Sequence, residues 1–141
     1  MKHFVISTLL LLAPLCSAMG QFGINYYLSD LSFAGFYYTF ANRLTGEFRL
    51  NTSVFVEDLS PELVATYRFV NQDSHAAYAG VGGRFNAFPG VVLPIGFQVS
   101  PFEGMRNFAI SSELAILAIS EGDTILRGAI GFRYYFVRGD P

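Results

Sequence analysis

Residues 124–136 read Thr-Ile-Leu-Arg-Gly-Ala-Ile-Gly-Phe-Arg-Tyr-Tyr-Phe. Large apolar side chains lie an even number of residues apart here, at Leu126, Ile130, Phe132, Tyr134 and Phe136. Charged and small residues occupy intervening positions, at Arg127, Gly131 and Arg133. A period of two predicts a β-strand, because successive side chains of a strand point to opposite faces. We therefore expect a strand with one apolar face and one face of small and charged residues.

The same alternation recurs seven times earlier in the chain. The predicted strands are residues 22–28, 33–41, 47–56, 62–70, 77–85, 91–99 and 108–119. Turn-forming residues separate them, such as Ser29-Asp30, residues 42–46 and Pro89-Gly90. Pro94 weakens one of these predictions, since proline has no N–H to donate to a neighbouring strand. Eight strands joined by short connections predict an all-β fold, an eight-stranded antiparallel up-and-down barrel.

The first 18 residues resemble a secretory signal peptide. Lys2 and His3 precede an apolar run over residues 4–15, and the small residues Ser17 and Ala18 follow it. The run is too short to cross a bilayer, which needs about 20 residues. We expect cleavage after Ala18, which leaves residues 19–141 as one barrel domain. Cys16, the only cysteine, would leave with the signal; a lipid-anchored Cys16 or an N-terminal core helix are the alternatives.

The composition excludes some classes of partner. The chain is 52% hydrophobic and 14% charged, with a formal net charge of −2. Its arginines form no basic run, so binding to nucleic acid is not expected. A single lysine, Lys2, stands in the predicted signal, and a protein surface in water normally carries lysine freely.

The alternation fits two kinds of barrel. In a soluble barrel the apolar faces form the core, whereas in a membrane barrel they meet lipid and the small faces line the interior. The small faces carry eight ionisable residues: Glu47, Arg49, Glu62, Arg68, Arg84, Glu113, Arg127 and Arg133. So few ions among small residues favour the interior of a transmembrane barrel. Buried ions need partners, so we expect the glutamates to pair with these arginines and plug the barrel.

A family resemblance is carried by the last strands. Residues 128–136 resemble the closing strand of small bacterial outer-membrane β-barrel proteins of the OmpA/OmpX type, and residues 93–97 and 108–114 are similar to their preceding strands. The chain departs from the family in having no Trp and in the tail 137–141, where an aromatic residue is usually last. The resemblance implies location in a Gram-negative outer membrane, contact with its lipids, and delivery by periplasmic chaperones. It also implies a C-terminal signal for the barrel-insertion machinery, formed by Ile130, Phe132, Tyr134 and Phe136.

The expected function is therefore structural or surface-interacting, in a monomer without a cofactor, a metal or a catalytic site. One alternative is a periplasmic or secreted lipocalin-like barrel that binds an apolar ligand. A second is an outer-membrane lipid-modifying enzyme, for which His75 beside Asp73 and Ser74 would be the candidate. The integrin-ligand tripeptide Arg138-Gly139-Asp140 is most simply a chance match.

Overall fold

The structure is a computed structural model, and its described residues are 20–52, 59–86 and 88–137. The predicted signal peptide and the tripeptide Arg138-Gly139-Asp140 lie outside them. The described part of the chain contains no helix that is long and apolar enough to cross a membrane.

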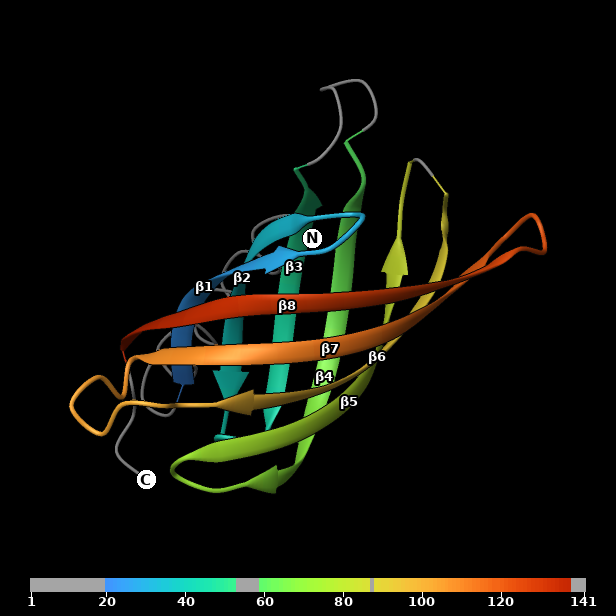
Figure 1. Cartoon of the computed structure of the whole chain (residues 1–141). Coiled ribbons are helices and arrows are strands. Elements are labelled where there is room, and N and C mark those ends of the chain that lie inside the picture. Colours follow the sequence, from blue (N-terminus) through green and yellow to red (C-terminus); the bar gives the residue numbers. More distant parts are fainter. Residues whose placement is uncertain (1–19, 53–58, 87, 138–141) are drawn as a thin grey trace, which may run out of the picture.

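Eight strands form one closed antiparallel barrel (Figure 1). They are β1 (Gly20–Leu28), β2 (Phe33–Phe40), β3 (Leu44–Asn51), β4 (Pro61–Asn71), β5 (His75–Arg84), β6 (Gly90–Val99), β7 (Phe108–Ile119) and β8 (Thr124–Val137). Each strand pairs with the next, and β8 closes the barrel against β1. The predicted all-β, eight-stranded, up-and-down architecture is confirmed.

The start of β3 corrects the predicted boundaries. A turn was expected over residues 42–46, yet β3 begins at Leu44, and Phe40 pairs directly with Leu44. The connection is tight because Ala41 and Asn42 have φ angles of 47° and 60°, which lets the Arg43 amide donate to the Phe40 carbonyl at 3.1 Å. Two left-handed residues match the twist of the flanking strands. Of the predicted third strand, residues 53–56 fall outside the described part.

Pro94 lies inside β6, which runs unbroken from Gly90 to Val99. Because Pro94 has no amide N–H to donate, the pairing of β6 with β5 is interrupted at this position. Paired positions run up to Ala79 and Ile95 and resume at Gly82 and Val92, so Pro94 lies in the gap. The barrel therefore accommodates this proline by omitting pairs on one side of the strand only, since β6 pairs with β7 throughout.

The two ends of the barrel differ. At one end β1 begins, β8 ends, and three turns join β2 to β3, β4 to β5, and β6 to β7; we call it the terminal end. The other end, the hairpin end, holds the remaining four connections. There the β7–β8 hairpin extends beyond the neighbouring strands of the wall in the view of Figure 1.

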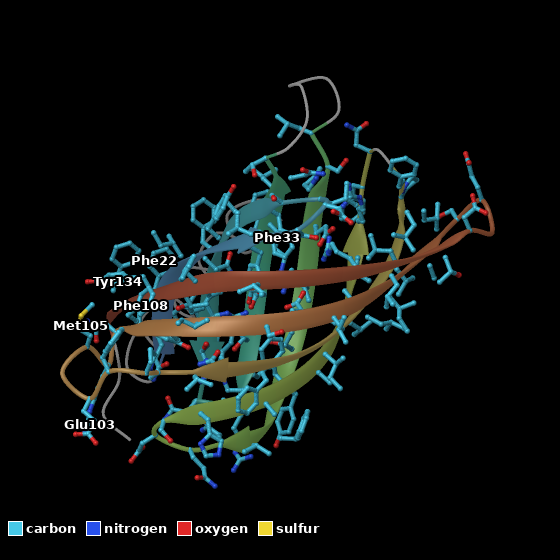
Figure 2. The ribbon with its side chains drawn as sticks, viewed as in Figure 1. Phe22, Phe33, Glu103, Met105, Phe108 and Tyr134 are labelled. Carbon is cyan, nitrogen blue, oxygen red and sulfur yellow. The ribbon has the colours of Figure 1, made fainter. Side chains whose placement is uncertain are left out.

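The large apolar side chains point outward from every strand (Figure 2). The exposed ones on the wall are Phe22, Ile24, Tyr26, Leu28, Phe36, Phe40, Leu44, Leu63, Tyr67, Phe69, Val81, Val91, Leu93, Ile95, Phe97, Val99, Ile110, Leu114, Ile116, Leu126, Ile130, Phe132, Tyr134 and Phe136. Inward positions hold the ions together with Gln21, Asn25, Thr39, Thr45, Thr66, Gln98 and Ser111, all buried. The barrel thus has the charged side chains of its strands inside and most of its large apolar side chains outside, although Phe33, Val92 and Leu117 are buried in the interior.

Candidate functional site: the barrel interior

All eight ionisable residues singled out in the sequence are buried inside the barrel. Seven of them form two clusters of ion pairs, and Arg68 makes a different contact. The alternation places each on the inner face of its strand, and the curvature of a narrow barrel brings inner faces of opposite strands within reach.

The first cluster, the Glu47–Glu113 cluster, lies at mid-height. Arg49 from β3 binds Glu113 from β7 through two bonds, Nη1 to Oε1 at 2.7 Å and Nη2 to Oε2 at 2.9 Å. Its Nε also donates to Glu47 Oε2 at 2.7 Å. Glu47 in turn pairs with Arg133 of β8 across the lumen. Two carboxylates and two guanidiniums balance one another here.

The second cluster, the Glu62 cluster, lies nearer the hairpin end. Glu62 receives hydrogen bonds from Arg84 of the adjacent strand at 2.8 Å and from Arg127 of β8 at 2.6 and 3.1 Å. One carboxylate thus holds two guanidiniums among the described residues.

Aromatic rings pack between the ions. The Arg49 and Arg127 guanidiniums lie 4.8 Å and 4.5 Å from the centroid of the Phe33 ring. The Tyr78 hydroxyl donates to Glu113 Oε2 at 2.8 Å, and Arg133 Nε donates to the Tyr27 hydroxyl at 2.9 Å. Cation–π contacts of this kind are worth about 2 kcal/mol or more where water is excluded. The rings therefore stabilise the guanidiniums as well as filling space.

Each inward tyrosine lies opposite a glycine on a neighbouring strand. Tyr27 pairs with Gly131 and Tyr78 with Gly96, while Gly23 pairs with a tyrosine on each side. A Cβ on Gly96 would lie 2.3 Å from the Tyr78 ring, and one on Gly131 would lie 2.5 Å from the Tyr27 ring. The glycines therefore make the room that the rings occupy. The sequence pattern predicts these residues on the small faces of their strands but does not reveal this pairing.

An apolar layer closes the interior at the hairpin end. Val92, Ala115 and Leu117 form a buried cluster against Ile125. Their positions alternate correctly for the inner face, where only small and charged residues were expected from the sequence. The alternation of inward and outward positions, continued to the end of β7, is the sequence signal that would have placed these residues inside the barrel.

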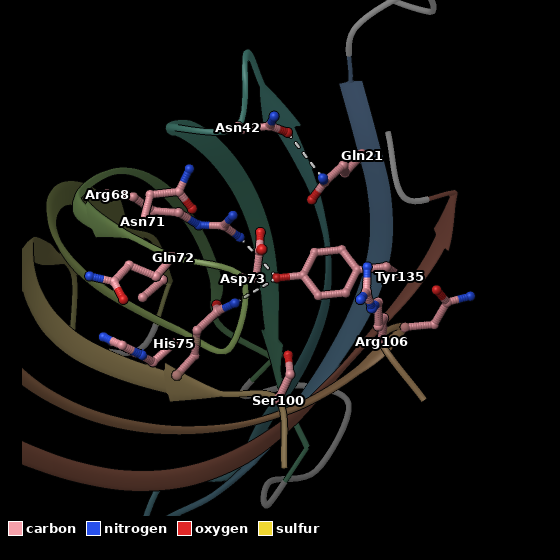
Figure 3. A pocket seen from close by; sticks show the side chains of 13 residues that line it. Gln21, Asn42, Arg68, Asn71, Gln72, Asp73, His75, Ser100, Arg106 and Tyr135 are labelled. Atoms are coloured by element: carbon pink, nitrogen blue, oxygen red, sulfur yellow. Dashed lines mark hydrogen bonds between the residues drawn. The ribbon is translucent and has the colours of Figure 1, made fainter. Parts of the chain in front are cut away.

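The terminal end of the lumen holds an open polar cavity of about 370 Å³ (Figure 3). Arg68 forms part of its floor, where Nη2 donates to the Tyr135 hydroxyl at 2.9 Å, and Gln98 Nε2 donates to the same hydroxyl at 2.8 Å. Asp73 of the β4–β5 turn and His75, the first residue of β5, also line the cavity. This cavity could not be predicted from the sequence, because turns from three connections form its rim.

The catalytic candidate of the sequence analysis lies at this rim. Ser74 Oγ is 3.1 Å from His75 Nδ1, in an exposed contact between neighbours in the chain. No group of three or more His, Cys, Asp or Glu side chains within the described residues is placed to hold a metal ion.

Comparison with known proteins gives no match of any kind, whether to a family model, a curated protein or a solved structure.

Proposed function

We propose that the chain is a small outer-membrane β-barrel protein with a structural or surface-interacting role, non-enzymatic, whose interior is plugged rather than open. The observation that carries this proposal is the direction of its side chains. Buried ions and exposed Leu, Ile, Phe and Val are the reverse of what water favours, and they match a barrel whose wall meets lipid. An exposed apolar surface of this extent needs an apolar environment to cover it.

Closure of the sheet supports the same proposal. Backbone N–H and C=O groups in a bilayer have no water to bind, so a sheet within it must have no free edge. The strands contain between 8 and 14 residues, and about 9–11 tilted residues are enough to cross the hydrocarbon layer.

A belt of aromatic rings at the terminal end is the third support. Phe22 stacks on Phe136 with centroids 5.7 Å apart, and Phe108 stacks on Phe132 at 5.8 Å. Figure 2 labels Phe22, Phe108 and Tyr134 at this end of the wall. Membrane barrels carry such girdles where the bilayer meets water. With the chain termini in the periplasm, the four connections of the hairpin end would face the cell exterior.

The side chains of the interior support the proposal that the lumen is plugged. Three ion pairs cross the lumen, between Arg49 and Glu113, Arg127 and Glu62, and Arg133 and Glu47. An eight-stranded barrel is just wide enough for side chains to fill it. We therefore expect no ion conductance when the protein is placed in planar lipid bilayers.

Fractionation tests the location. The full chain is expressed in a Gram-negative bacterium, and the membranes are separated by density and washed with alkaline carbonate. We expect the protein in the outer-membrane fraction, released only by detergent, with a gel mobility that changes on heating. Recovery in the carbonate wash or in the periplasm would contradict the proposal and favour the lipocalin-like alternative, which shares the closed eight-stranded barrel.

A further inference from the structure

The polar cavity at the terminal end opens along the barrel axis. Its lining comes from inward side chains near the strand ends and from the turns at that end (Figure 3). Toward mid-height the lumen is occupied by the Glu47–Glu113 cluster and its tyrosines. Among the described residues, the cavity is therefore a cup whose mouth faces the terminal end.

Arg68 is the unusual charge in this cup. It is 5% exposed, and its side chain donates to the Tyr135 hydroxyl. The other four interior arginines form ion pairs with glutamates, whereas Arg68 pairs with no carboxylate of the described residues. A buried guanidinium without a counter-charge is costly, and Arg68 lines a cavity large enough to admit one.

Gln98, beside Arg68 in the lining of the cavity, has a buried hydrogen-bond acceptor without a partner in the described part of the chain. It is 6% exposed, and its Nε2 donates to Tyr135. Its Oε1 is buried and has no hydrogen-bond partner among the described residues. A buried acceptor of this kind favours a ligand that brings an O–H or N–H group.

We propose that this cavity binds a small soluble anion that carries hydroxyl groups, such as a sugar phosphate. The anionic group lies against the Arg68 guanidinium, since guanidinium forms strong charge-assisted bonds to phosphate and carboxylate. A hydroxyl donates to Gln98 Oε1, and the amides of Gln21 and Asn42, which bond each other at 3.0 Å, line the wall beside it. Because the mouth opens along the axis and not through the wall, the ligand is a solute rather than a lipid headgroup.

Charges of both signs line the cavity, so removing one sign or the other should change anion binding in opposite directions. Arg106 adds a positive charge to the lining, and Asp73 adds a negative one. Asp73 should oppose an anion at Arg68, so its removal should strengthen binding while removal of Arg68 should weaken it. Binding should also weaken in high salt, because mobile ions screen these charges.

The test titrates the purified full chain in phospholipid-free micelles of a nonionic detergent by isothermal calorimetry. The probes are glucose 6-phosphate, inorganic phosphate and glucose. We expect glucose 6-phosphate to bind most tightly, phosphate more weakly and glucose least. Arg68→Gln should weaken glucose 6-phosphate binding by about tenfold or more, the worth of one hydrogen bond to a charged group. Asp73→Asn should strengthen it.

Arg43→Gln is the matched control, because Arg43 is an exposed arginine at the same end that does not line the cavity. Its affinity should stay close to that of the wild type. A heat-dependent gel mobility shows which variants have folded. If Arg68→Gln does not fold, Arg68→Met and Asp73→Asn test the two signs instead. Failure of the wild type to bind either anion, or equal binding by the folded Arg68 variants and the wild type, would overturn the proposal. Neither result depends on whether the barrel resides in a membrane.

Discussion

Arg49 and Glu113 meet across the barrel lumen in a two-bond pair, although they stand on strands β3 and β7, far apart around the wall. Both side chains are fully buried, at 0% and 1% exposure. The pair therefore links opposite sides of the barrel, and its removal should destabilise the barrel as a whole.

Replacing Glu113 with Ala should lower the temperature at which the barrel unfolds on a semi-native gel. The change leaves Arg49 with only Glu47 and removes the acceptor of the Tyr78 hydroxyl. Loss of one partner from a buried ion pair costs about 3–5 kcal/mol. Glu103→Ala, at an exposed position of the β6–β7 connection, is the control and should behave as the wild type. Equal unfolding temperatures for the two variants would show that the plug does not stabilise the barrel.

Replacing Tyr78 with Phe should destabilise the barrel less, by about 1.5–3 kcal/mol, the range for a hydrogen bond to a charged group. The hydroxyl donates to Glu113 and lies 3.2 Å from the Tyr27 hydroxyl, while the ring itself is retained. Tyr67→Phe makes the same chemical change on the outer wall, where the side chain is 51% exposed. Urea titration of both variants in micelles measures the difference, and a loss as large for Tyr67→Phe would argue against the assigned contact.

Replacing Gly96 with Ala should destabilise the barrel by about 1–3 kcal/mol, the usual cost of overpacking. The added Cβ would lie 2.3 Å from the Tyr78 ring, which the ion cluster holds in place. Gly46→Ala is matched to it, because a Cβ there meets nothing within 4 Å. Equilibrium unfolding monitored by circular dichroism distinguishes them. Unaltered stability in Gly96→Ala would mean that the ring can move aside.

Replacing Leu114 with Arg distinguishes a wall in lipid from a wall in water. Leu114 points outward at mid-strand, between Ile95 and Gly128 on the adjacent strands. An arginine at the middle of a bilayer costs about 2–4 kcal/mol, so folding into lipid vesicles should fall sharply. Met105→Arg, in the exposed β6–β7 connection, should fold normally. On a water-facing wall Leu114→Arg would instead be harmless.

Replacing Phe136 with Ala tests the proposed C-terminal signal. Ile130, Phe132, Tyr134 and Phe136 all point outward on β8, and Phe136 also contacts Phe22 and Tyr134. We expect less barrel inserted in cells but a near-normal yield on refolding in detergent, since the signal is read only by the insertion machinery. Phe97→Ala, an outward phenylalanine of β6, is the matched control. Parallel losses for both variants, in cells and in refolding, would indicate a packing defect instead.

Strand number, order and the inward or outward direction of side chains could be predicted from the sequence, because all of them follow from a period of two. The ion partners could not. Glu62 and Arg127 are 65 residues apart, and only the closed curvature brings them together. The start of β3 was missed because a left-handed Ala41-Asn42 turn has no strong sequence signal. The cavity around Arg68 needed the turns to be placed in space.

The ion pairs also constrain how the protein assembles. Arg49 of β3 pairs with Glu113 of β7, a strand that is not its neighbour, and Arg127 and Arg133 reach their glutamates only from β8, the last strand made. Among the described residues, a sheet lacking that strand would leave Glu62 with Arg84 alone, and Glu47 would share its single arginine partner, Arg49, with Glu113. Isolated hairpins are therefore poor intermediates, and the barrel should become stable in a single cooperative event when its final strand arrives.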